Sequence, residues 1–80
     1  MKINVLFSGI ATDLVGATSL DFETTPEATI SEFKTELQSQ FPNLTEINSY
    51  AIAVNESYAS SETTLKENDV VAIIPPVSGG

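Results

Sequence analysis

The chain has 80 residues, of which eleven are acidic and three are lysines, so its formal net charge at neutral pH is −8. It contains no cysteine, histidine, arginine or tryptophan. Without cysteine and histidine, the chain has no disulfide, no thiolate nucleophile, no sulfur metal ligand and no imidazole for proton transfer at neutral pH. The negative charge argues against nucleic acid and an anionic membrane surface as partners, and it suits a partner with a basic docking surface.

The small size limits what the chain can build by itself. A chain of this length buries only about 60–65% of its unfolded surface, which predicts a single domain without a deep active-site cleft. The carboxylates are scattered and form no D-x-[DN]-x-[DN]-G calcium loop, so we expect them to be solvated surface charges. The sequence opens into a strand pattern rather than a leader peptide, and its apolar runs are too short to cross a bilayer. We therefore expect a cytoplasmic protein with no bound cofactor or metal.

The first quarter of the chain predicts two strands around a short helix. Residues 2–7 alternate, with three large apolar side chains on one face, and Leu6 makes the other face partly apolar, which is typical of a central strand. Ile10, Leu14 and Val15 then fall at helical spacing, and Gly16 is placed to end that helix. Residues 19–23 alternate again, and the short connection predicts that the two strands pair antiparallel.

The main helix is predicted after a loop over residues 24–27. Thr29 and Glu32 have the spacing of a capping box, in which each side chain bonds the backbone N–H of the other residue. The apolar residues that follow recur three or four positions apart and form one stripe, which must lie on a sheet: Ile30, Phe33, Leu37 and Phe41. Pro42 stops the helix.

The second half of the chain predicts three further strands, over residues 50–54, 57–59 and 70–74. Residues 42–49 are expected to be an irregular polar connection, which Leu44 and Ile47 hold against the body. Two asparagines are placed in turns where a left-handed backbone is tolerated, Asn55 and Asn68. Leu65 is an isolated apolar residue in the polar segment between the last two strands and is expected to plug the core.

The order β, short α, β, long α, β, short β, β predicts an α+β domain of two layers. We expect a mixed sheet of four to five strands, packed on one main helix. The first and last strands are the most apolar, so we place them side by side in the centre, where they would run parallel. This is the β-grasp, or ubiquitin-like, arrangement.

The carboxyl-terminal segment, residues 75–80, follows the last strand as an extended tail on a body formed by residues 1–74. Pro75 and Pro76 cannot donate a backbone N–H and fix φ, so they end the strand and stiffen the exit. Extended residues span about 3.3–3.6 Å each, so residues 76–80 reach roughly 17 Å from the body. Gly79 and Gly80 have no Cβ, so this end of the chain fits a channel too narrow for a side chain.

The α-carboxylate of Gly80 is the group on which chemistry is expected. A carboxylate is a poor electrophile, but ATP can convert it to an acyl-adenylate, which a sulfur or nitrogen nucleophile can attack. A Gly-Gly ending by itself fits a frayed terminus better than a reactive tail. The buried strand and the proline pair that lead into it favour a presented, reactive tail.

The ending Val70–Gly80, with its Pro-Pro-Val before the two glycines, resembles that of the small subunits of molybdopterin synthase. Similar matches occur at Lys2–Phe7, Ala53–Asn55 and Leu65–Asp69, so the resemblance covers essentially the whole chain. It departs from the family in residues 8–14, where basic residues are usual and none is present, and at Asn68, where glycine is common. The missing basic residues leave the identity of the partner open.

This resemblance implies a β-grasp body and a sulfur-carrying tail. A ubiquitin-activating-like adenylyltransferase would use ATP to adenylate Gly80, and a sulfur donor would convert it to a thiocarboxylate. The tail would enter the active site of the large, catalytic subunit, within a heterotetramer, and give its sulfur to cyclic pyranopterin monophosphate. The partner-binding residues implied by position are Pro75, Pro76, Val77, Ser78 and Gly79. The chain would carry sulfur without catalysing a reaction by itself.

Three alternatives share the predicted fold and ending. The chain could carry sulfur for another pathway, such as that to the thiazole of thiamine, or modify proteins as ubiquitin does. It could also be a binding module whose carboxylate is captured without chemistry. The double proline followed by valine favours the molybdopterin branch.

Overall fold

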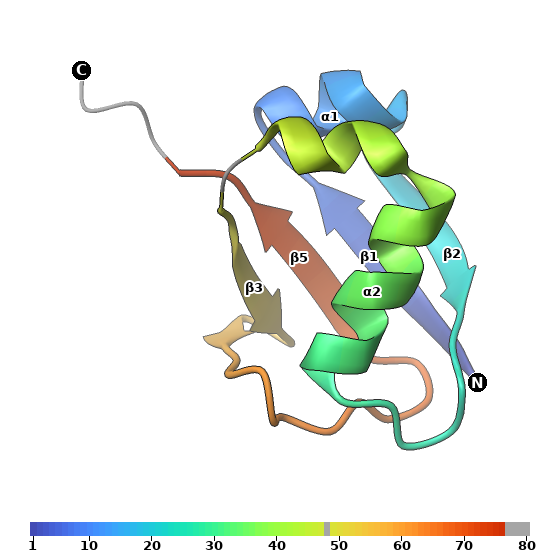
Figure 1. The fold of residues 1–80 in the computed structure, drawn as a ribbon. Helices are drawn as coiled ribbons and strands as arrows, with labels where there is room; N and C mark the ends of the chain where they lie inside the picture. Colours follow the sequence, from blue (N-terminus) through green and yellow to red (C-terminus); the bar gives the residue numbers. More distant parts are fainter. Residues whose placement is uncertain (48, 77–80) are drawn as a thin grey trace.

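The computed structural model describes residues 1–47 and 49–76, and within these ranges the chain forms the elements expected of a two-layer α+β domain. Their bounds are β1 (Lys2–Phe7), α1 (Ile10–Val15), β2 (Ser19–Glu23), α2 (Ile30–Gln40), the 3₁₀ helix η1 (Pro42–Glu46), β3 (Ala51–Val54), β4 (Ser57–Tyr58) and β5 (Val70–Ile74). Figure 1 shows α2 crossing one face of the sheet, with α1 and η1 together at the end where β1 and β5 finish.

The strands form one mixed sheet in the order β2-β1-β5-β3-β4. β1 pairs antiparallel with β2 and parallel with β5, in a register that sets Val5 opposite Val71 and Phe7 opposite Ile73. β3 pairs antiparallel with both β5 and β4. The predicted central parallel pair, formed by the first and last strands, is therefore confirmed.

The core lies between the sheet and α2. Side chains of a strand alternate between the two faces, and on each central strand the set that faces α2 is buried. Phe33 of α2 is fully buried and meets Phe22 of β2 edge-on, with 5.4 Å between the ring centroids. Phe7 of β1 makes a similar contact with Phe41, at 6.3 Å. The stripe predicted on the helix is therefore the face that packs on the sheet.

The helix ends follow the local signals in the sequence. The Thr29 hydroxyl accepts from the Glu32 backbone N–H at 3.2 Å, and the Glu32 carboxylate accepts from the Thr29 N–H at 2.9 Å, so the predicted capping box is present. α1 ends at Gly16, whose φ of 84° is left-handed, and its N–H bonds the carbonyl of Thr12. Both ends thus satisfy backbone groups that a helix terminus leaves without partners.

The turns predicted at two asparagines are also confirmed. Asn55 and Glu56 have φ of 50° and 72° and form the hairpin between β3 and β4, and Asn68 has φ of 69° just before β5. The Asn55 side chain accepts from the Val70 N–H at 3.0 Å and donates to the Asp69 carboxylate at 2.9 Å. It therefore ties the hairpin to the start of β5.

The connection after α2 differs from the prediction. Residues 42–49 were expected to be irregular, but Pro42–Glu46 is a 3₁₀ helix that begins with the proline. Proline suits a first helical turn because its φ is preset and its missing N–H would have no partner there. Leu44 and Ile47 are buried, so the expectation that they hold this segment to the body is correct. Each strand of the β3–β4 hairpin is one residue shorter than predicted: β3 begins at Ala51 instead of residue 50, and β4 ends at Tyr58 instead of residue 59.

The burial of Phe33 yields a test of this packing. We expect Phe33→Ala to lower the free energy of unfolding by about 3–5 kcal/mol, because it removes apolar contact and leaves a cavity. Ser39→Ala, at an exposed position of the same helix, should change it by less than about 0.5 kcal/mol. Urea denaturation followed by circular dichroism measures both. Equal values for the two variants would contradict the assignment of this helix face to the core.

Candidate functional site

The carboxyl end of β5 is the place where the chain leaves the core. Val71 and Ile73 are fully buried, and Ile74 still pairs with Ala51 of β3. Pro75 is half-buried and Pro76 is exposed, so the chain passes from core to surface within a few residues. A Cβ built on Gly9, in the turn between β1 and α1, would lie 3.8 Å from the Cγ atom of Pro75. The root of the tail is thus held between β3 and this turn.

The remaining predicted site residues, Val77, Ser78, Gly79 and Gly80, lie outside the described residues, so their roles stay predictions. The division into a body of residues 1–74 and a tail of residues 75–80 also stays a prediction. β5 ends at Ile74, as the sequence predicted.

The sheet face opposite α2, here called the outer face, carries a largely apolar centre. The strand registers place there the outward side chains of the two central strands and of the β3–β4 hairpin: Leu6, Val70, Ala72, Ile74, Ala51, Ala53 and Tyr58. Leu6 and Val70 are 38% and 37% exposed, and Tyr58 is 78% exposed. Exposed apolar patches with polar surroundings mark interaction sites, and this one adjoins the root of the tail.

The outer face is polar along β2, where Asp21 and Glu23 point outward beside Lys2 and Asn4 of β1. The Lys2 amine lies 4.0 Å from the Asp21 carboxylate, and both side chains are well exposed. An apolar centre with a polar, charged rim is the usual anatomy of a protein interface. The sequence had a signal for this face: Leu6 and the unbroken apolar run of β5 need cover on both sides, but only one long helix is predicted.

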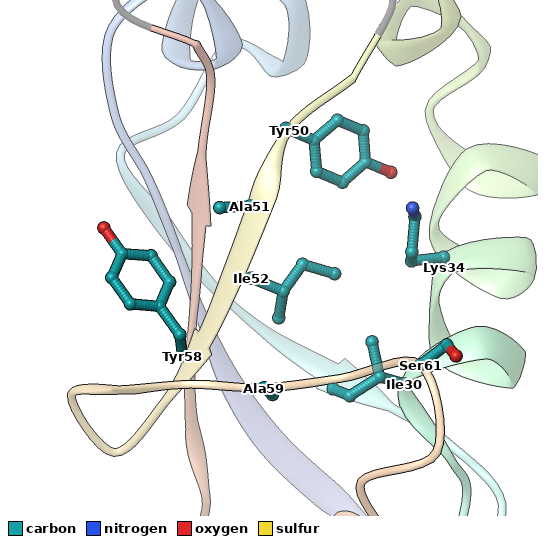
Figure 2. A pocket seen from close by; sticks show the side chains of 8 residues that line it. All are labelled: Ile30, Lys34, Tyr50, Ala51, Ile52, Tyr58, Ala59 and Ser61. Atoms are coloured by element: carbon teal, nitrogen blue, oxygen red, sulfur yellow. The ribbon is translucent and has the colours of Figure 1, made fainter.

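A small hollow lies on the helix side of the sheet, between α2, β3 and the segment after β4 (Figure 2). Its volume is about 150 Å³, and it is lined by Ile30, Lys34, Tyr50, Ala51, Ile52, Tyr58, Ala59 and Ser61. Small-molecule sites generally span about 300–1,000 Å³, so this hollow is too small for a substrate of that class.

The polar groups of the hollow serve packing. The Lys34 amine lies 5.0 Å from the centroid of the Tyr50 ring, and Gln38 donates to the Tyr50 hydroxyl at 3.2 Å. Burial raises the pKa of the Tyr50 phenol above its ordinary range, although the Gln38 hydrogen bond lowers it in part. The phenol is therefore neutral at physiological pH. Lys34 and Gln38 are half-buried because they cover this ring.

Over residues 1–47 and 49–76, no three acidic side chains come close enough to form a metal site. No helix in the same ranges has the length and hydrophobicity needed to cross a membrane. The features that the described residues do show are β5, which is anchored in the core and leads to Pro75 and Pro76, and the adjoining apolar outer face, which a partner can cover.

Comparison with known proteins places the chain in a family. The family model described as "ThiS family" matches residues 5–80. The chain belongs to the ThiS family. A relative, the molybdopterin synthase sulfur carrier subunit of Arabidopsis thaliana, is 35% identical over 81 residues, covering 100% of this chain and 84% of its own length.

Solved structures agree with the predicted β-grasp fold. SAMP1 from Haloferax volcanii superposes with a TM-score of 0.88, covers 100% of both chains and is 18% identical, so it supports the fold alone. A chain in the complex of subunits 1 and 2 of the molybdopterin-converting factor from Helicobacter pylori 26695 has a TM-score of 0.72 at 28% identity, with 100% of both chains covered. The β-grasp prediction is confirmed.

Proposed function

We propose that this ThiS-family chain is the sulfur carrier subunit of a molybdopterin synthase. In this proposal the Gly80 carboxylate is adenylated by an ATP-dependent adenylyltransferase, receives sulfur from a donor as a thiocarboxylate, and passes it to cyclic pyranopterin monophosphate in the large subunit. The chain itself supplies the carried group and the docking surface, and the two partner enzymes supply the catalysis. It binds no cofactor of its own; ATP is used by the activating partner.

The observation that carries the proposal is the exit of β5. The inward side chains of this strand, Val71 and Ile73, are buried in the core, and the chain then meets two prolines that end the ladder and direct it away from the sheet. Because the backbone up to Pro76 is restricted before binding, this part of the chain loses little further entropy when a partner binds the tail. The full-length match to a sulfur carrier subunit supports the same reading.

The outer face supports a stable complex with the large subunit. Its apolar centre lies on β1, β5 and β3, and β5 is also the strand that leads into the tail, so one partner can cover the face and receive the tail together. The Helicobacter pylori relative is found in a complex of its two subunits. The net charge of −8 favours docking on a basic surface.

The first test concerns the carried group. Incubation with the adenylyltransferase, ATP and a sulfide source should raise the intact mass by the difference between sulfur and oxygen, and fragmentation should place the change on Gly80. Omission of ATP should abolish it. A mass change on another residue, or none with an enzyme that activates a known carrier, would contradict the proposal. Conjugation of Gly80 to lysines of other proteins would favour the modifier alternative instead.

The second test concerns the width of the tail. Gly79→Val keeps the length and the carboxylate but adds a branched side chain where only backbone should fit. We expect normal folding, near-normal docking and a severe loss of adenylation or transfer, with Gly79→Ala losing less. Melting curves, binding measurements and the mass assay separate these effects. Transfer by Gly79→Val at the wild-type rate would show that the channel is not narrow at this joint.

The third test concerns the outer face. Leu6→Glu places a charge in the apolar centre and should weaken binding to the large subunit by about 1–3 kcal/mol, because the carboxylate would be buried without a partner. Thr35→Glu adds the same charge at an exposed position of α2, on the opposite side of the domain, and should change affinity little. Titration calorimetry gives both values. Equal affinities for the two variants would place the interface elsewhere.

A further inference from the structure

The turn between β1 and α1, residues Ser8 and Gly9, lies beside the root of the tail. β1 and β5 are parallel, so both finish at the same edge of the sheet, and their pairing ends at Phe7 and Ile73. Beyond this pair β1 continues into the turn while β5 continues to Ile74 and Pro75. The tail therefore starts next to a segment that is far from it in the sequence.

Ser8 supplies a contact where the ladder ends. Its hydroxyl donates to the backbone carbonyl of Ile73 at 3.3 Å, in a part-buried position. Pro75 has no N–H and cannot extend the pairing with β1. The serine side chain therefore adds a link between the two strands just before the chain leaves the sheet.

Gly9 sets the path of the turn. Its φ of 56° and ψ of −137° lie in a region that residues with a side chain rarely adopt. An added Cβ would be in ordinary contact with Pro75, at 3.8 Å, so a methyl group fits in the available space. The backbone of a residue with a side chain would nevertheless be strained at this positive φ. The glycine is needed for the conformation that turns β1 into α1 while keeping the turn against the proline.

We propose that Ser8 and Gly9 are positioning residues for the carboxyl-terminal tail: together they fix the direction in which the chain leaves β5. Because proline fixes φ, a tilt at the root changes the direction in which Pro75 and Pro76 lead the chain away from the sheet. A displacement of about 1 Å at a reacting group can cost on the order of 100-fold in rate. The effect on sulfur transfer rests on the proposed function, whereas the contact with Pro75 does not.

Gly9 and Gly16 provide a matched pair of substitutions, since they flank the same helix and both have positive φ. Gly16 has φ of 84° and nothing within 4 Å of the position of a Cβ, whereas Gly9 adjoins Pro75. Both Gly9→Ala and Gly16→Ala should lower the melting temperature through backbone strain. Only Gly9→Ala should shift the carbon resonances of Pro75 and Pro76 and lower kcat for adenylation, by about tenfold, with KM nearly unchanged.

Ser8 is tested by removal and rescue of its hydroxyl. Ser8→Ala should move the Pro75 resonances in the same direction as Gly9→Ala and lower kcat by a smaller factor, while Ser8→Thr, which keeps a hydroxyl, should restore both. If Ser8 contributed only to stability, Ser8→Ala would lower the folded fraction without a specific loss of kcat at unchanged KM, and Ser8→Thr would not restore kcat.

Two outcomes would overturn the positioning role. One is unchanged Pro75 resonances in Gly9→Ala; the other is an equal loss of kcat in Gly9→Ala and Gly16→Ala. If the wild-type chain is not adenylated by a competent activating enzyme, the proposed function fails. The positioning of the tail root is then decided by the Pro75 and Pro76 resonances alone.

Discussion

The pairing of β1 with β5 is the contact on which the rest of the structure depends. It joins the two ends of the sequence at the centre of the sheet, under α2, and β2 and β3 add to its two sides. The strands are parallel, so they finish at one edge, which brings the β1–α1 turn to the root of the tail. Separation of these two strands would therefore disrupt both the core and the position of the tail root.

A five-stranded sheet with one long helix has two unlike faces. The inner face is covered by α2 and is fully buried at Val5, Val71 and Ile73. The outer face has exposed apolar side chains, and polar side chains in their place would make a free small domain more soluble. In the proposed function, the large subunit covers these side chains beside the tail exit, which explains why they are retained. The net charge of −8 favours solubility of the free chain.

The proposed division of labour with partner enzymes is compatible with the residue types in the chain. No cysteine, histidine or arginine is present to act as nucleophile, proton carrier or phosphate clamp. The hollow at Tyr50 is small, and its polar groups are occupied in packing. A carrier needs none of these groups, because its task is to hold one carboxylate at a defined distance and direction from a docked body. The proposed function therefore asks of the chain only what its fold supplies.

The sequence by itself determined nearly all of the local structure. Alternation set the strands, and the capping box at Thr29 and the glycine at position 16 set helix ends, because these signals act between residues a few positions apart. The sequence pattern did not predict the 3₁₀ helix that begins at Pro42, because a proline that ends one helix can also begin the next. The sequence also indicated the tail and its chemistry, through the prolines and the two glycines.

Only the tertiary structure decided which distant groups meet. That Ser8 bonds the Ile73 carbonyl and Gly9 lies beside Pro75 depends on the parallel register of β1 and β5, which no local pattern encodes. For the outer face, the sequence indicated that one helix could not cover both sides of the central strands, but only the strand registers show that Leu6 and Val70 share that face. Local patterns are set by short-range sterics and hydrogen bonding, whereas these contacts require the folded sheet to bring the two ends of the chain together.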